Sequence, residues 1–193
     1  MRELGSGRSN CSSRTLRWVT ALRPLLLTGG PAVGKTTTAR ALAETTEPCA
    51  YVDVDDVRQM IKSGGVAPWK GAEGRAQHLL GIRNAAVLVA NFTDAGINVI
   101  LSDVVTQDLL SIYRDLVPEL VTIRLACDLA TARARASTRP VHLTIEEFEM
   151  LHRQQTEPLE TDSELDVSGM TLDAQVDAVR RHWRSRSEGV GSR

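Results

Sequence analysis

The feature that most constrains this chain is an eight-residue segment, Gly29-Gly30-Pro31-Ala32-Val33-Gly34-Lys35-Thr36, which fits the pattern G-x-x-x-x-G-K-[ST]. Glycines allow the backbone to turn so that successive N–H groups point at the oxygens of a phosphate group. An apolar run at 25–28 precedes the segment, and strong helix formers at 34–44 follow it. The segment therefore predicts a strand, a phosphate-binding loop and a helix whose positive N-terminus adds to the anion site.

The residue types in this loop predict a nucleoside triphosphate site that uses ATP and Mg²⁺. Lys35 is placed to reach the β- and γ-phosphates, so we expect it to be catalytic, and the Thr36 hydroxyl is expected to complete the shell of the metal ion. A glycine-rich turn with an incidental lysine would not explain the strand and the helix around it. The residues expected to bind the nucleotide are Gly29, Gly30, Pro31, Ala32, Val33, Gly34, Lys35, Thr36 and Thr37.

Apolar runs and helical segments alternate along the whole chain, which is typical of parallel strands joined by right-handed helical crossovers. We therefore expect an α/β three-layer sandwich with a parallel sheet of about five strands. The predicted strands are 25–28, 50–54, 97–101, 120–126 and 165–167. The predicted helices are 34–44, 55–62, 73–92, 108–116, 128–136, 144–155 and 171–183, with a loop at 64–74.

The 193 residues fit one domain, which we place at residues 23–184. We expect residues 1–22 to be a flexible N-terminal extension and residues 185–193 to be a disordered basic tail. Five arginines stand against one glutamate in residues 1–23, and again in residues 180–193, so the body between them holds 13 basic and 22 acidic residues. An acidic body disfavours nucleic acid as a partner, because that affinity depends on clustered lysine and arginine.

The cysteines and the apolar runs indicate the cellular location that we expect for the protein. Cys11, Cys49 and Cys127 are scattered and form no metal-binding spacing, which is typical of reduced thiols in a cytoplasmic protein. No stretch approaches 18 uninterrupted apolar residues, so we expect no membrane-spanning helix. The sequence leaves the oligomeric state open.

A second group of polar residues follows the predicted strand 50–54. Ligands of an open parallel sheet bind at the carboxyl ends of its strands. If strands 25–28 and 50–54 are close neighbours, Asp55 projects toward the transferred phosphate and accepts the proton of a substrate hydroxyl. Arg58, one helical turn later, is expected to hold a polar or anionic group of the substrate. The alternative is that Asp55 only caps a helix, and Asp53 has a supporting or capping role.

Asp103 and three arginines in the second half of the chain are further candidates. Asp103 follows the predicted strand 97–101 and is expected either to contact substrate or to hold Mg²⁺ through water, with helix capping as the alternative. Arg135 and Arg139 share a helix face at i,i+4, which suits a lid that neutralises the charge of the transferring phosphate. We expect Arg135 to be catalytic, Arg139 to bind the nucleotide and Arg133 to be solvated.

Three further features have structural explanations beside functional ones. Trp69 lies in the predicted loop 64–74 and is either a wall of the substrate site or an anchor of that loop. Thr144 and Glu147 have the spacing of a capping box. The histidines have no metal-ligand spacing and are expected to be exposed or internally hydrogen bonded; they are His78, His142, His152 and His182.

The residues after the second predicted strand resemble two families of kinases. Residues 53–58 match D-x-D-x-x-R of the adenylylsulfate kinases, and residues 55–59 match D-D-x-R-Q of the polynucleotide 5′-hydroxyl kinases. Both resemblances imply a catalytic base at Asp55 and a substrate-binding arginine at Arg58.

The second half of the chain resembles the chloramphenicol phosphotransferase-like kinases. The resemblance lies in residues 95–105, in Cys127-Asp128 with the arginines at 135 and 139, and in residues 164–168. Together the similarities cover roughly residues 24–180 and imply a P-loop NTPase fold of the nucleotide-kinase and shikimate-kinase type with a short lid. Residues 63–76 match none of these families' substrate regions.

These resemblances imply a kinase that transfers the γ-phosphoryl group of ATP to a hydroxyl of a small-molecule acceptor. One alternative is a polynucleotide or nucleoside 5′-hydroxyl kinase. Another is a non-kinase P-loop ATPase, including one of the AAA type. The acidic body and only seven aromatic residues disfavour a nucleic-acid substrate, because single strands are bound by basic grooves and stacking rings.

Overall fold

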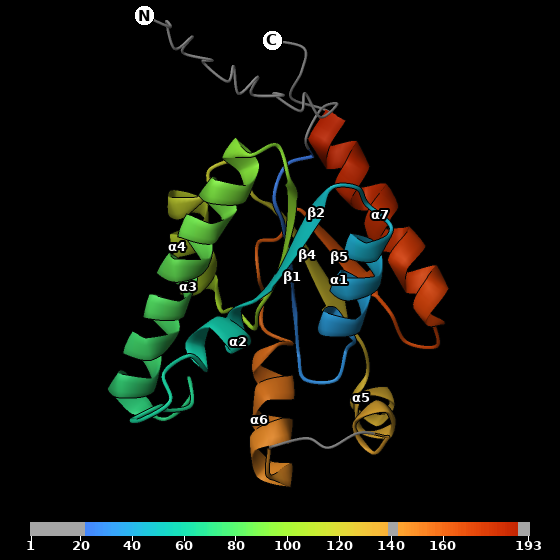
Figure 1. Cartoon of the computed structure of the whole chain (residues 1–193). Coiled ribbons are helices and arrows are strands. Elements are labelled where there is room, and N and C mark those ends of the chain that lie inside the picture. The colour runs from blue at the N-terminus through green and yellow to red at the C-terminus, as the bar shows by residue number, and fades with distance from the viewer. Residues whose placement is uncertain (1–21, 139–142, 189–193) are drawn as a thin grey trace, which may run out of the picture.

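The structure, a computed structural model, describes residues 22–138 and 143–188 and contains one parallel sheet covered on both faces by helices (Figure 1). Its strands are β1 (Leu25–Gly29), β2 (Cys49–Asp53), β3 (Asn98–Ser102), β4 (Val121–Ala126) and β5 (Ser163–Asp166). They lie in the order β2-β3-β1-β4-β5, and every neighbouring pair is parallel. The α/β three-layer sandwich is thereby confirmed.

The helices form two layers and a group at one edge of the sheet. Helices α1 (Lys35–Glu44) and α7 (Leu172–Glu188) pack together on one face, and α3 (Gly71–Asp94) and α4 (Gln107–Leu116) on the other. Three further helices lie near the carboxyl-terminal ends of the strands in Figure 1: α2 (Val54–Arg58), α5 (Leu129–Ala136) and α6 (Ile145–Gln154). Among the described residues, no helix combines the length and the apolar character needed to cross a bilayer.

Strand β1 shows how the apolar run builds both layers of the core. Leu25 and Leu27 join the cluster on the α1–α7 face, and Leu26 joins the cluster on the α3 face, because successive side chains of a strand point to opposite faces. All three are fully buried, and each buried leucine contributes about 1.5–3 kcal/mol through removal of apolar surface from water. A strand buried on both faces holds the loop that follows it in a rigid frame.

The strand order corrects one expectation about the site. The first two predicted strands are not neighbours, because β3 lies between β1 and β2 and pairs with both. The crossover through α3 returns the chain beside β1, and hydrophobic pattern alone does not encode that choice. Asp55 therefore follows a strand that lies two positions from the phosphate-binding loop.

Several boundaries also differ from the sequence prediction. Val54 is the first residue of α2 and not the last of β2, because Asp53 caps the helix there. Helix α3 begins at Gly71, inside the predicted loop 64–74. Helix α7 runs to Glu188, so the first four residues of the predicted tail 185–193 are helical.

Candidate functional site

The loop between β1 and α1 has backbone angles that require glycine. Gly29 has φ 138°, and a Cβ placed there would lie 2.1 Å from the carbonyl oxygen of Leu125 on β4. Gly34 has φ 97° and precedes the first residue of α1, Lys35. These two glycines let the loop fold back against β4 and enter the helix, which turns the N-terminal N–H groups of α1 toward the loop.

Lys35 and Thr36 begin α1 and lie beside the loop. The Lys35 ammonium donates hydrogen bonds to the carbonyl oxygens of Gly29 (2.8 Å) and Gly30 (2.9 Å). The Thr36 hydroxyl donates to Asp53 Oδ2 over 3.3 Å. The loop therefore gathers a cation, a hydroxyl and a carboxylate within one small region.

Asp53 at the end of β2 is the cap of α2. Its Oδ1 accepts from the N–H of Asp55 (3.1 Å), and its Oδ2 accepts from the hydroxyl of Tyr51 (2.8 Å) as well as from Thr36. The Tyr51 hydroxyl also lies 2.7 Å from Ser102 Oγ on β3, and burial raises the pKa of Tyr51 to about 12. The capping role left open for two aspartates thus belongs to Asp53, and the Asp55 carboxylate is not needed for it.

Asp55 and Arg58 of α2 border a cavity of about 510 Å³, and the Arg58 side chain is only 14% exposed. Arg58 Nη2 donates to Asp55 Oδ1 over 3.1 Å, and 54% of the Asp55 side chain is exposed. The same cavity is lined by Lys35 and Thr36, so α2 faces the phosphate-binding loop although their strands are not adjacent.

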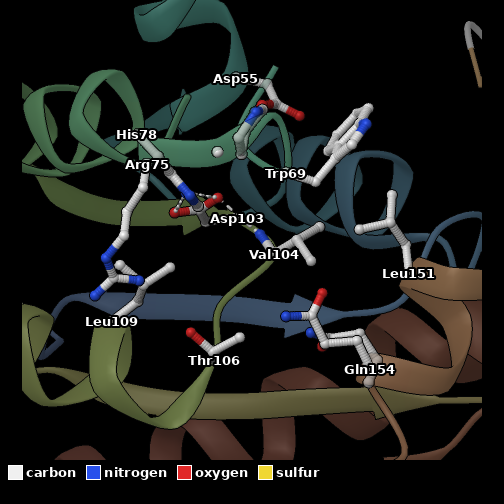
Figure 2. A pocket seen from close by; sticks show the side chains of 13 residues that line it. Asp55, Trp69, Arg75, His78, Asp103, Val104, Thr106, Leu109, Leu151 and Gln154 are labelled. Carbon is white, nitrogen blue, oxygen red and sulfur yellow. Dashed lines mark hydrogen bonds and ion pairs between the residues drawn. The ribbon is translucent and has the colours of Figure 1, made fainter. Parts of the chain in front are cut away.

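A second cavity, of about 310 Å³, opens beside the first (Figure 2). Arg75 and His78 of α3 and Leu109 of α4 line it, and Leu151 lies on the side opposite them. The two cavities share five lining residues, which are Asp55, Trp69, Asp103, Val104 and Leu151. Asp55 therefore stands where the two cavities meet.

Asp103 follows β3 and is buried in a network of donors. His78 Nε2 lies 3.0 Å from both of its oxygens (Figure 2), and the hydroxyl of Tyr113 donates to Oδ2 over 2.7 Å. Burial lowers the pKa of His78, but the hydrogen bond and negative charge of Asp103 outweigh burial, so the pKa of His78 is raised. Burial and the charge of Asp103 raise the pKa of Tyr113 well above its usual value. This network holds Asp103 at a position where it lines both cavities.

A third cavity, of about 230 Å³, lies on the other side of the loop, and Arg135 and Gln175 are among its lining residues. The guanidinium of Arg135 donates to the carbonyl oxygens of Val33 (3.0 Å) and Val167 (2.9 Å). The amide of Gln175 donates to Thr38 Oγ1 over 2.8 Å. Arg135 thus connects α5 to the phosphate-binding loop and to the segment after β5.

The remaining candidates lie in different surroundings. Arg139 and His142 fall outside the described residues. Arg133 is more than half exposed and pairs with Glu149 of α6, as expected for a solvated residue. His78 is internally hydrogen bonded, as expected, and the capping box of Thr144 and Glu147 is present at the start of α6.

Tyr113, Tyr51 and Gln175 are parts of the site that the sequence pattern does not predict. Tyr113 reaches Asp103 from α4, and Gln175 reaches the loop from α7 across 142 residues of sequence. None of them belongs to a local motif, and their side chains alone carry no signal. Only the register of the strands and the helix packing brings them to the site.

The comparisons with known proteins place the chain in a family. A family model described as an AAA domain matches residues 25–157, so the chain belongs to that family of P-loop domains. A search of the curated proteins found no match. The matched segment contains the phosphate-binding loop and α2, and it includes all the residues that line the first two cavities.

Solved structures of small-molecule kinases share the fold. An unliganded sugar kinase from Janibacter sp. HTCC2649 is 18% identical, with a TM-score of 0.65, and the match covers 89% of this chain and 99% of that one. The APS kinase of Mycobacterium tuberculosis, in complex with AMPPNP and APS, is 15% identical with a TM-score of 0.65, covering 85% and 98%. A gluconokinase from Sinorhizobium meliloti 1021 is 13% identical with a TM-score of 0.67, covering 88% and 96%. The chain therefore has the α/β fold of the P-loop kinases.

Proposed function

We propose that the protein is an ATP-dependent kinase that phosphorylates a hydroxyl group of a small molecule. The observation that carries the proposal is the position of Asp55, which borders both the cavity of the phosphate-binding loop and the cavity next to it. A phosphoryl group held by the loop and a hydroxyl group held in the second cavity would meet beside this carboxylate. The names of the similar structures, which include a sugar kinase and a gluconokinase, support a small-molecule acceptor.

The nucleotide is assigned to the loop and the third cavity. The backbone from Gly29 to Thr37 would cradle the phosphates, and Lys35 would leave its carbonyl partners to contact the β- and γ-phosphates. The nucleobase of ATP would enter the third cavity, where Arg135 holds the loop by a hydrogen bond to the carbonyl oxygen of Val33. Arg135 and Arg139 keep the lid role expected of them, in which they offset the charge of the transferring group.

The oxygen atoms of Thr36 and Asp53 fit a Mg²⁺ ion. A hydroxyl and a carboxylate that lie 3.3 Å apart beside the phosphate-binding loop are the hard oxygen ligands that this ion takes, directly or through water. When bound, the ion would neutralise charge on the β- and γ-phosphates. Asp53 is the carboxylate hydrogen bonded to Thr36, whereas Asp103 is hydrogen bonded to Tyr113 and to His78, which lines the second cavity, so we assign Asp103 to the acceptor in preference to the metal.

Asp55 is proposed as the base of the transfer step. The acceptor oxygen attacks the γ-phosphorus, the bond from that phosphorus to the β,γ-bridging oxygen breaks, and ADP leaves as a phosphate ester forms. The proton of the hydroxyl passes to Asp55. Arg58 pairs with Asp55 Oδ1 and also lines the loop cavity, so it would orient the base and contact a polar group of the acceptor.

A two-stage experiment tests this assignment. The Mg²⁺ complex of AMPPNP should raise the melting temperature of the wild type and not that of Lys35→Ala. Wild type should then transfer label from γ-labelled ATP to a compound in a panel of hydroxyl compounds, and Asp55→Asn should bind AMPPNP but lose transfer by a factor of at least about 10². Unchanged transfer by Asp55→Asn would show that Asp55 is not the general base.

The same panel separates the alternatives. A 5′-hydroxyl oligonucleotide belongs in it, because the Asp55–Gln59 run resembles the polynucleotide kinases. Rapid ATP hydrolysis without transfer to any compound would favour a non-kinase ATPase. Absence of an AMPPNP response in the wild type would reject nucleotide binding altogether.

A further inference from the structure

Trp69 forms part of the wall at the junction of the loop cavity and the acceptor cavity. Its half-buried indole lines both cavities, and so does Leu151 of α6. In Figure 2 these two apolar side chains lie on the same side of the acceptor cavity, with Asp55 next to the indole. The point of phosphoryl transfer in the proposed function is therefore bordered by a carboxylate and by a large apolar surface.

The indole is held in place from a distant part of the chain. Trp69 Nε1 donates to Glu147 Oε1 over 3.0 Å, although 78 residues separate them, and Lys70 Nζ lies 3.0 Å from the same oxygen. The other oxygen, Oε2, accepts the N–H of Thr144 over 3.1 Å and closes the capping box of α6. One carboxylate therefore both begins α6 and fixes the segment that precedes α3.

A capping box requires only the contacts between Thr144 and Glu147. The contacts with Trp69 and Lys70 are additional, and they use the oxygen that does not accept the Thr144 N–H. The Glu147 side chain is 20% exposed, so its hydrogen bond with the indole is partly shielded from competing water. The orientation of Trp69 at the junction is thus fixed by a charge-assisted hydrogen bond.

We propose that Trp69, held by Glu147, is a positioning residue that excludes water from the transfer point. The inference rests on the proposed function, because it concerns the same junction. A base that accepts the proton of an alcohol also accepts the proton of water, so Asp55 alone does not discriminate between them. The apolar wall supplies that discrimination because a water molecule in line with the γ-phosphate finds no hydrogen-bond partner on the side formed by Trp69 and Leu151.

The reaction that competes with transfer to the acceptor is the hydrolysis of ATP. Water oxygen attacks the γ-phosphorus, the bond from phosphorus to the β,γ-bridging oxygen breaks, and ADP and inorganic phosphate are released. The proton of the water passes through Asp55 to the solvent. Hydrolysis without an acceptor therefore reports whether water reaches the junction, and it needs no knowledge of the natural acceptor.

The test measures ATP hydrolysis in the absence of any acceptor. Trp69→Ala should hydrolyse ATP about tenfold faster than the wild type, and Trp69→Phe, which keeps an aromatic ring, should show a smaller increase. The increase should disappear in the double variant Trp69→Ala/Asp55→Asn. A rate in Trp69→Ala equal to that of the wild type, or an increase that survives loss of Asp55, would overturn the proposal.

A matched pair of variants separates the hold on Trp69 from the capping of α6. Glu147→Ala loses both functions, and Thr144→Ala loses the capping box but keeps the carboxylate that binds the indole. Glu147→Ala should raise hydrolysis and Thr144→Ala should not, although both lower the melting temperature. Equal hydrolysis rates in the pair would show that only helix stability matters and would reject the inference.

The AMPPNP response keeps this test distinct from the test of the proposed function. If the wild type shows no melting shift with AMPPNP and Mg²⁺, the proposed function itself fails. If the shift is present and the hydrolysis rates do not separate, only the role of Trp69 fails. Because Trp69→Phe preserves most of the packing, it provides a readout even if Trp69→Ala does not fold.

Discussion

The hydroxyl of Thr36 donates to Asp53 Oδ2, which joins the first turn of α1 to the end of β2 across the intervening strand β3. The two residues lie 17 positions apart, and each is held by its own backbone element: Thr36 by α1, Asp53 by its capping of α2. Both oxygens are therefore held by secondary structure, so the Mg²⁺ ion of the proposed function would bind without rearrangement of either element.

Removal of either oxygen should weaken Mg²⁺-dependent nucleotide binding. Asp53→Asn retains a residue that caps helices well, so the fold should persist. The rise in melting temperature caused by AMPPNP should lose its dependence on Mg²⁺ in Asp53→Asn and in Thr36→Val, measured with Mg²⁺ and with EDTA. Asp56→Asn, on the same helix, is the control and should respond like the wild type. A normal Mg²⁺ response in both variants would exclude the pair as metal ligands.

Gly29→Ala should destabilise the protein by more than about 3 kcal/mol, because the new Cβ meets a backbone oxygen and φ is positive. The contact is with the carbonyl of Leu125 at 2.1 Å, in a strand that cannot move aside. Gly64 also has a positive φ, but nothing lies within 4 Å of a Cβ there. Gly64→Ala should cost only about 1–2 kcal/mol. Urea unfolding of the two variants measures the difference, and equal losses would contradict the steric argument.

Tyr113→Phe should lower the free energy of unfolding by about 1–3 kcal/mol, since it leaves a buried carboxylate without one of its donors. The phenol is buried and donates to Asp103 over 2.7 Å. Chemical denaturation measures the loss. The effect should be smaller in an Asp103→Asn background, because a neutral amide needs the donor less. The same loss in both backgrounds would assign it to packing and not to the carboxylate.

Glu147 should make stability depend on acid pH. Hydrogen bonds from Trp69, the Thr144 N–H and Lys70 lower the pKa of Glu147 from 4.5 to about 2. A pKa that is lower in the folded state favours folding above the unfolded value, and this contribution is lost as pH falls from about 4.5 to about 2. The stability of Glu147→Gln should therefore fall less steeply than that of the wild type across this window. Parallel curves of melting temperature against pH would contradict the lowered pKa.

The phosphate-binding loop and the elements around it could be predicted from the sequence because their signals are local. The phosphate-binding loop, the strand before it and the helix after it occupy consecutive residues, 25–44, and the apolar run is buried on both faces. The order of the strands could not be predicted in the same way. Both β1–β2 and β1–β3 adjacency satisfy the same hydrophobic pattern, and long-range packing decides between them.

The second cavity depends on contacts that sequence spacing does not encode. His78 and Asp103 lie 25 residues apart, and Trp69 and Glu147 lie 78 apart. The capping box was recognisable from Thr144 and Glu147, but a helix-capping pattern says nothing about which other side chain reaches the same carboxylate. Asp53 was ambiguous for a related reason: the exact start of α2 decides which aspartate caps it.

The insertion of β3 between β1 and β2 has an evolutionary consequence. Lys35 and Thr36 follow β1, whereas Asp55, Trp69 and His78 belong to the segment between β2 and β3. Segments that line a single cavity can diverge separately, and of the two adjoining cavities Arg75 and His78 line the second one alone, whereas Asp55 and Trp69 line both. Under the proposed function, replacement of residues 71–80 by those of a related chain would therefore alter the acceptor cavity and leave the phosphate-binding loop in place.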